Sequence, residues 1–305
     1  MVKIGIPRAG YTYEYCSLWK GFFEELGLEV VLSPETTEQI ADNGVKKSDT
    51  NLCFAMKVYV GHVLELKEKV EYIFVPNMST TDKTQFHCPY HKATSDLLKN
   101  MFPDLQILVA NLEINHSTEQ ISEKNKSELF KVGKILKKQK KDMKVALDKA
   151  FKAWKDGKEK EVKEDKIRLQ DKSAGYKIAI IGISYILKDK FCITSILEFL
   201  EEESALPIYL HNGHLENNHY PGFKVRWIVE QELINKYMEA TKSREIDGII
   251  YVVPFSCGPC FLFQEQVVGQ KTDKPTLILH MDESLNQTLI KTRIEAFIDV
   301  IKNKK

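Results

Sequence analysis

Hydrophobic residues in the first third of the chain follow two alternating patterns: short apolar runs, and apolar residues that recur every three or four positions. The run "VKIGIP" predicts a strand, whereas "YEYCSLWKGFFEELG" has the period of a helix and ends at Gly27. The same alternation continues to residue 112. We expect strands at 2–7, 28–33, 70–77 and 105–112, and helices at 13–27, 36–47, 53–69 and 91–102.

The alternation returns in the last part of the chain, beginning with the apolar run "YKIAIIGIS". Strands that alternate with helices pair in parallel, so each of these parts predicts an α/β domain with a parallel sheet. We expect strands at 176–184, 206–212, 246–255 and 274–280, and helices at 192–204, 224–243, 257–270 and 286–305.

The segment between these two parts has a different composition. Residues 127–170 are rich in Lys and Glu, and their apolar residues are spaced as in one or two amphipathic helices. Acidic residues are interleaved with the lysines, which favours a solvated helix face over a nucleic-acid patch. The sequence thus predicts an N-terminal α/β domain at 1–112, a charged helical segment at 113–173 and a C-terminal α/β domain at 174–305.

Composition excludes several classes of protein. The 305 residues are 43% hydrophobic and carry a formal net charge of +1, so the chain has no general attraction for nucleic acid or for an anionic membrane. It contains no apolar stretch of about 20 residues that would span a bilayer. The start, "MVKIGIPRAG", lacks the features of a signal peptide, and we expect a cytoplasmic protein. Its six cysteines are then expected to be reduced thiols.

Cysteine is the residue type that points most directly to chemistry. Cys257 and Cys260 form a Cys-x-x-Cys pair in "VVPFSCGPCFLF", directly after an expected strand. Cys88 follows another strand within "HCPYH", and Cys53 begins a helix. Open parallel sheets bind ligands beyond the carboxyl ends of their strands. We therefore expect these four thiols in the cleft between the two domains, where soft thiolates suit zinc or an iron–sulfur cluster.

Two other kinds of protein fit parts of this pattern. "CGPC" is the active-site sequence of thioredoxin, but Phe255-Ser256 stands where thioredoxin has a Trp, and only about 15 residues separate the pair from "KPTLILH". A zinc-binding or scaffold module also remains open, although the chain lacks a second Cys-x-x-Cys pair. The histidines that could ligate a metal are His87, His91, His211, His214 and His219.

Several motifs together resemble the family related to the activase and D-component of 2-hydroxyacyl-CoA dehydratases. The resemblance covers both α/β parts and implies two Rossmann-like parallel-sheet domains. It also implies an anaerobic, cytoplasmic iron–sulfur protein that acts in low-potential electron transfer or reductive activation. The motifs that carry it are "KIGIPRAGYTYEYCSLWKGFFEELGLEVVLSP", "CFAMKVYVGHV", "EYIFVPN", "CPYH", "DGIIYVVPFSCGPC" and "MDESLNQTLIKTRIEAF".

The resemblance also implies a cofactor and a partner. The cysteines that match the family pattern, and so are expected to hold a [4Fe-4S] cluster, are Cys53, Cys88, Cys257 and Cys260. Cys16 and Cys192 also follow expected strands, and six convergent cysteines would suit a double-cubane [8Fe-9S] cluster. The expected partner is an ATP-dependent, electron-donating activator protein, and relatives suggest a homodimer. The chain is shorter than a two-subunit dehydratase, which favours an accessory role.

Overall fold

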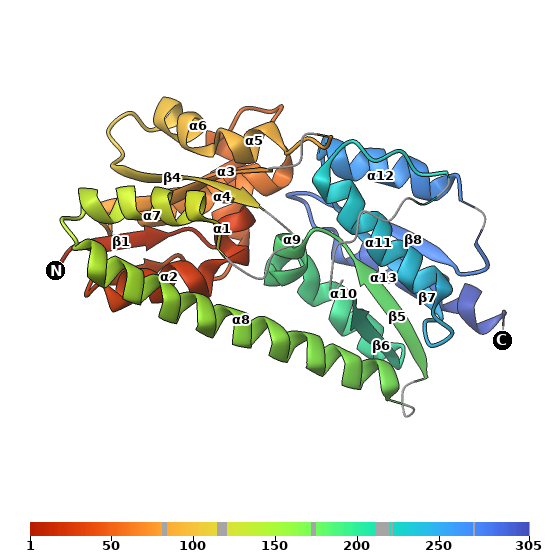
Figure 1. The fold of residues 1–305 in the computed structure, drawn as a ribbon. Helices are drawn as coiled ribbons and strands as arrows, with labels where there is room; N and C mark the ends of the chain where they lie inside the picture. Colours follow the sequence, from red (N-terminus) through yellow and green to blue (C-terminus); the bar gives the residue numbers. More distant parts are fainter. Residues whose placement is uncertain are drawn as a thin grey trace. The chain divides into compact units, whose positions relative to one another are not determined.

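The computed structural model of the chain describes residues 1–80, 84–114, 121–171, 175–210, 220, 222–270 and 272–304. The chain divides into two compact units, Met1–Glu159 (the N-terminal unit) and Lys160–Lys305 (the C-terminal unit). Each unit contains one four-stranded sheet whose neighbouring strands all pair in parallel, with helices around it (Figure 1). The predicted α/β class with two Rossmann-like parallel-sheet domains is confirmed.

The sheet of the N-terminal unit has the strand order β2-β1-β3-β4. Its elements are β1 (Lys3–Ile6), α1 (Gly10–Glu14), α2 (Cys16–Glu25), β2 (Glu29–Leu32), α3 (Glu38–Lys47), α4 (Phe54–Leu66), β3 (Tyr72–Thr80), α5 (Pro89–Lys92), α6 (Thr94–Met101), β4 (Ile107–Ile114), α7 (Glu123–Ile135) and α8 (Lys140–Gln170), the last of which continues across the boundary into the C-terminal unit.

The sheet of the C-terminal unit has the equivalent order β6-β5-β7-β8. Its edge strand β6 contains Pro207, whose missing N–H would break a ladder inside a sheet but is tolerated at an edge. Its elements are β5 (Tyr176–Ile181), α9 (Ser184–Lys188), α10 (Lys190–Glu202), β6 (Ala205–Tyr209), α11 (Ile228–Lys242), β7 (Gly248–Pro254), α12 (Gly258–Val268), β8 (Thr276–Met281) and α13 (Gln287–Lys302).

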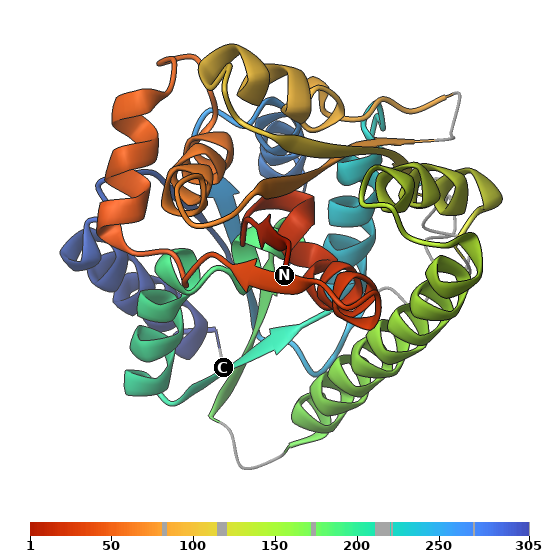
Figure 2. The same ribbon diagram turned by 90° about the vertical axis from the view of Figure 1, so that its left-hand side faces the viewer.

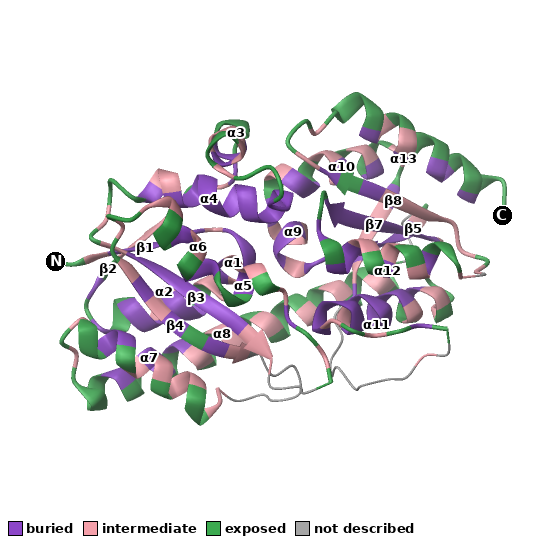
Figure 3. Ribbon diagram, turned by 90° about the horizontal axis from the view of Figure 1, so that it is seen from above, coloured by how far each residue is buried: buried purple, intermediate pink, exposed green. Residues whose placement is uncertain are grey.

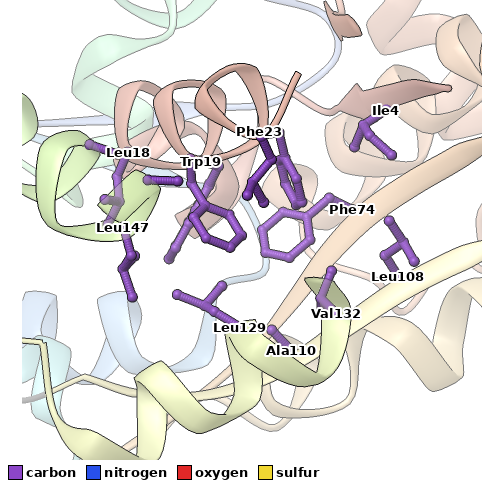
Figure 4. Packing of buried hydrophobic residues seen from close by; sticks show 14 of the residues in the cluster. Ile4, Leu18, Trp19, Phe23, Phe74, Leu108, Ala110, Leu129, Val132 and Leu147 are labelled. Atoms are coloured by element: carbon purple, nitrogen blue, oxygen red, sulfur yellow. The ribbon is translucent and has the colours of Figure 1, made fainter. Parts of the chain in front are cut away.

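Aromatic side chains fill the core of the N-terminal unit between the sheet and its helices (Figure 4). The rings of Trp19 and Phe23 from α2 lie 5.4 and 5.1 Å from the ring of Phe74 on β3, measured between centroids. Tilted and edge-on ring pairs at these distances add to the stabilisation from apolar burial.

The charged segment that follows β4 contributes to the same core. Leu129 of α7 and Leu147 of α8 are each 1% exposed, and α8 lies beside α2 (Figures 1 and 2). A Cβ at Gly21 of α2 would stand 3.2 Å from the Cβ of Ala150. The amphipathic pattern of this segment is thus the signature of helices packed on a sheet, and only its polar face is solvated.

Helices α3 and α4 cross at unusually close range, through one glycine on each. A Cβ added to Gly44 would lie 2.0 Å from the carbonyl oxygen of Lys57, and one added to Gly61 would lie 2.1 Å from that of Ile40. Helix α3 covers α4 on the outside, so that residues 54–63 of α4 are all buried (Figure 3). Bare backbone on both helices allows this contact and fixes the position of α4.

The free edge of β4 is covered by side chains of α7. The side-chain amide of Asn125 accepts a hydrogen bond from the Glu113 N–H and donates one to the Glu113 carbonyl oxygen, each at 2.8 Å. Two residues earlier on β4, the Asn111 N–H donates to the Glu128 carboxylate at 3.2 Å. These contacts occupy the backbone groups that an edge strand otherwise leaves open.

Three local breaks differ from the sequence expectations. The expected helix at 13–27 is two helices, α1 and α2, which meet at Tyr15; the helix at 91–102 divides at Ala93; and the short helix α9 precedes α10. Among the described residues, no helix combines the length and the apolar character needed to cross a membrane.

Candidate thiol site

The C-terminal cysteine pair is placed by a buried strand that runs directly into a helix. All seven residues of β7 are buried, and Ser256 then adopts a left-handed conformation (φ +62°) that turns the chain. Cys257 is the N-cap of α12, and Pro259 occupies its first turn, where the missing N–H is no loss. The two thiols are 8% and 0% exposed, so this turn holds a buried Cys-x-x-Cys pair at a helix start.

The two thiols of this pair interact with each other. A hydrogen bond from the Cys260 thiol lowers the pKa of Cys257, against the opposing effect of burial. The hydroxyl of Tyr251, on the strand before the turn, donates to the carbonyl oxygen of Cys260 at 3.0 Å. The lowered pKa favours the thiolate form of Cys257, which suits nucleophilic attack or the binding of a soft metal.

Cys53 and Cys88 belong to the N-terminal unit, and each is the N-cap of a helix, α4 and α5 respectively. Cys53 is 6% exposed, whereas Cys88 is half-buried. Tyr90 on α5 extends towards the loop before Cys53, with its hydroxyl 3.5 Å from the carbonyl oxygen of Asn51. Cys53 was expected at a helix start and is found there, whereas the N-cap position of Cys88 was not expected.

Tyr11, His87 and His91 form a cluster of rings, and the two histidines stand on either side of Cys88 in the sequence. The ring of Tyr11 lies 5.3 Å from that of His87 and 4.8 Å from that of His91, between centroids. Gly10 has φ +52°, and a Cβ there would stand 2.9 Å from Cε1 of His91, so only glycine fits. Burial, and then the charge of His87, lower the pKa of His91 to about 3, which keeps its imidazole neutral.

Cys16 and Cys192 have the surroundings of core thiols. Cys16 begins α2 after the intervening helix α1, and Cys192 lies within α10 after α9, so neither directly follows a strand. Burial raises the pKa of Cys16 to about 11 and raises that of Cys192 well above its usual value. Neither side chain is poised to ionise unaided.

None of the six cysteines forms a disulfide. Within the described part of the chain, no three His, Cys, Asp or Glu side chains come together in a way that could hold a metal ion. By their chemistry, the soft thiols fit an iron–sulfur cluster or zinc. His211, His214 and His219 lie outside the described residues.

Two features of this site escaped the sequence interpretation. Tyr251 lies in a run of apolar residues, where its hydroxyl was the one polar group able to reach the next turn. Gly10 follows "GIPRA", and its contact with His91 joins segments 81 residues apart. Tyr251 could have been recognised as a polar side chain in a buried strand, whereas no local signal marks the Gly10 contact.

Comparison with known proteins identifies the family. No curated protein sequence matches the chain. Residues 3–211 match the family described as CoA enzyme activase uncharacterised domain (DUF2229). The match includes Cys53 and Cys88 and ends before the Cys257–Cys260 pair. As it covers more than half of the sequence, the chain belongs to the CoA enzyme activase uncharacterised domain family.

Proposed function

We propose that this protein is an iron–sulfur component of the system that activates 2-hydroxyacyl-CoA dehydratases, and that it passes a low-potential electron. Its membership of a CoA enzyme activase family supports a role in that system. The proposed partner is an ATP-dependent activator protein that donates the electron. The proposed compartment is the reducing cytoplasm, where exposed thiolates and clusters persist.

The observation that carries this proposal is the position of three cysteines at helix N-termini. Cys53, Cys88 and Cys257 are the N-cap residues of α4, α5 and α12. A helix N-terminus carries partial positive charge, which stabilises a thiolate or an anionic cluster beside it. Such positions suit thiols that bind a metal centre better than thiols that only fill a core.

The proposed ligands of a [4Fe-4S] cluster are Cys53, Cys88, Cys257 and Cys260. When bound, such a cluster supplies one-electron transfer at low potential. The chain contributes thiolates and the backbone amides at the start of α12, which can donate to cluster sulfurs. A double-cubane cluster would draw in Cys16 and Cys192 as well.

Anaerobic metal analysis tests the proposal. We expect brown protein with about four irons per chain, and loss of iron and colour in the Cys257→Ala variant. Cys192→Ala is the matched control, because it removes a buried thiol of the same unit outside the proposed ligand set. Loss of iron in Cys192→Ala would instead indicate the larger cluster. Iron-free, colourless protein refutes the proposal, and stoichiometric zinc would assign the site to a zinc-binding module.

A second candidate function, dithiol oxidoreductase, is favoured by the contact between the Cys257 and Cys260 thiols. In that case the pair cycles between dithiol and disulfide, and Cys53 and Cys88 are dispensable. Thiol titration against a redox buffer measures this directly. A two-electron transition that persists in the Cys53→Ser/Cys88→Ser variant, with no bound metal, would favour it over the cluster.

A further inference from the structure

A cavity of about 720 Å³ opens at the C-terminal end of α11. It is lined by residues from the end of α11 and just after it, and by residues 270 and 272–274 ahead of β8. These segments lead into β7 and β8, which pair in parallel, so the cavity lies at the amino ends of the two strands. Cys257 and Cys260 follow the carboxyl end of β7, and the seven residues of that strand separate the cavity from them by roughly 20 Å.

Positive charge predominates among the side chains that line this cavity. Lys242, Arg244 and Lys274 are cationic, whereas Asp273 is the acidic residue among them. Lys242 and Arg244 are exposed, and within the described part of the chain neither side chain forms an ion pair or a hydrogen bond. The Lys242 ammonium lies over the ring of Tyr220, 5.2 Å from its centroid. These two charges are therefore available to a ligand.

The third cation, Lys274, answers the negative charge at the end of α11. The last carbonyl groups of a helix carry partial negative charge, which by itself would repel an anion. The Lys274 ammonium donates hydrogen bonds to the carbonyl oxygens of Ser243 and Ile246 at this helix end, and the charge of Asp247 also acts on it. The two exposed cations then outweigh the single carboxylate of Asp273 at the cavity.

Two hydroxyl groups in the cavity wall add hydrogen-bond donors. The Ser243 hydroxyl accepts the Glu245 N–H, and the Thr272 hydroxyl accepts the Lys274 N–H, each at 3.2 Å. A hydroxyl can accept and donate at the same time, so both O–H groups remain able to donate to a ligand.

The ring of Tyr237 lies deeper in the same wall. Tyr237 is 2% exposed, and its hydroxyl forms no hydrogen bond with the residues that the structure describes. The Thr276 side chain is near this hydroxyl but not in hydrogen-bonding geometry with it. A buried hydroxyl without a partner is unfavourable, and a ligand atom that reached the bottom of the cavity would satisfy it.

The groups that converge on the cavity are mainly donors, which favours a ligand rich in acceptors and negative charge. A phosphate ester offers three acceptor oxygens and close to two negative charges, and arginine binds it through two parallel hydrogen bonds. The volume lies within the range of about 300–1,000 Å³ that is typical of small-molecule sites, so there is room for more than a bare phosphate.

We propose that this cavity binds an organic phosphate about the size of a nucleoside monophosphate. Binding is by charge and hydrogen bonding, without a covalent step. The site does not depend on the proposed cluster, because its lining residues lie at the opposite end of β7 from the thiols.

Isothermal titration calorimetry of the full-length protein tests this site, with AMP, adenosine and inorganic phosphate as probes. We expect one AMP to bind per chain, more tightly than either of the other two. Arg244→Gln should weaken AMP binding roughly tenfold or more, because it removes a charge-assisted pair of hydrogen bonds. Arg244→Lys keeps the charge but not the paired hydrogen bonds, and its affinity should fall between the two.

Two further variants separate this site from general charge attraction and from the cluster. Arg226→Gln is the matched control, because Arg226 is also exposed but precedes the other end of α11; it should bind AMP as the wild type does. Cys257→Ser should also keep AMP binding, even if its iron is lost. The inference is overturned if AMP does not bind saturably, or if inorganic phosphate binds as tightly. It is also overturned if Arg244→Gln binds AMP as the wild type does, or if Arg226→Gln loses as much affinity.

Discussion

Replacement of Gly44 by alanine tests whether the close crossing of α3 and α4 stabilises the N-terminal unit. The new Cβ would lie 2.0 Å from the carbonyl oxygen of Lys57, whereas ordinary contact begins at 3.4 Å. The atom it meets is backbone, which cannot rotate away, so the helices must separate by about 1 Å. That separation loosens the packing of Ile40 and Ala41, which are 3% and 1% exposed.

The expected loss can be estimated from these opposing effects. Overpacking in a core costs about 1–3 kcal/mol, and a rigid backbone contact belongs at the upper end of that range. Alanine recovers up to about 1 kcal/mol through its better helix propensity. We therefore expect Gly44→Ala to lower the free energy of unfolding by about 2 kcal/mol, as measured by urea unfolding followed by circular dichroism.

Gly157→Ala is the matched control for this experiment. Gly157 is an exposed helical glycine of α8, and an added Cβ there meets nothing within 4 Å. Only the propensity gain applies, so stability should rise by about 0.5–1 kcal/mol. If Gly44→Ala proved as stable as the wild type, or gained as much as Gly157→Ala, the inference that the crossing requires bare backbone would be wrong.

Three further predictions concern hydrogen-bonding side chains that are buried or half-buried: His62, Tyr59 and Asn125. Burial and the charge of Arg8 lower the pKa of His62 to about 3 in the folded protein. An unfolded histidine titrates near pH 6.5, so between these two pH values protons bind preferentially to the unfolded chain. The free energy of unfolding should therefore fall by up to about 1.4 kcal/mol per pH unit from about pH 6.5 towards 3. His62→Gln should flatten that slope in urea unfolding between pH 7 and 4. Tyr59→Phe breaks the buried 2.9 Å hydrogen bond with Thr12 and should cost about 1–2 kcal/mol by the same assay. Asn125→Ala uncovers the edge of β4 and should cost about 1–2 kcal/mol and increase light scattering on storage.

Each of these has an outcome that would contradict it. An unchanged pH slope in His62→Gln would show that other groups control acid stability. Asn43→Ala removes an exposed side-chain hydrogen bond with Gln39 and should change stability by less than about 0.5 kcal/mol. If Asn125→Ala lost no more stability than this control, water would be replacing the amide at the strand edge. If Tyr59→Phe left the free energy of unfolding unchanged, water would be replacing the tyrosine hydroxyl beside Thr12.

The architecture was predictable because buried parallel strands occur in the sequence as short apolar runs, and segments with the apolar spacing of a helix separate them. "IDGIIYVVPF" and the Cys-x-x-Cys pair after it are contiguous, so the strand, the turn and the helix start were all predicted from one stretch. The break between α1 and α2 at Tyr15 was not predictable, because apolar residues keep their helical spacing on both sides of it. The short helix α9 also has no pattern of its own, because it is only five residues long.

In the candidate site, too, the features that depend on neighbouring residues were predictable, and those that depend on contacts between distant residues were not. The N-cap positions of Cys53 and Cys257 follow from local sequence, because each cysteine directly precedes an expected helical run. The contact between Gly10 and His91 does not, because it joins segments that are distant in the sequence.

The covered edge of β4 limits how copies of this protein can associate. With Asn125 and Glu128 already bonded to the backbone of Glu113 and Asn111, that strand is a poor template for a strand from a neighbouring molecule. Pro207 makes the outer side of β6 an equally poor template, because it has no N–H to offer. Any homodimer of this chain must therefore form without extending its sheets through either of these strands, and its contacts there would be made by side chains.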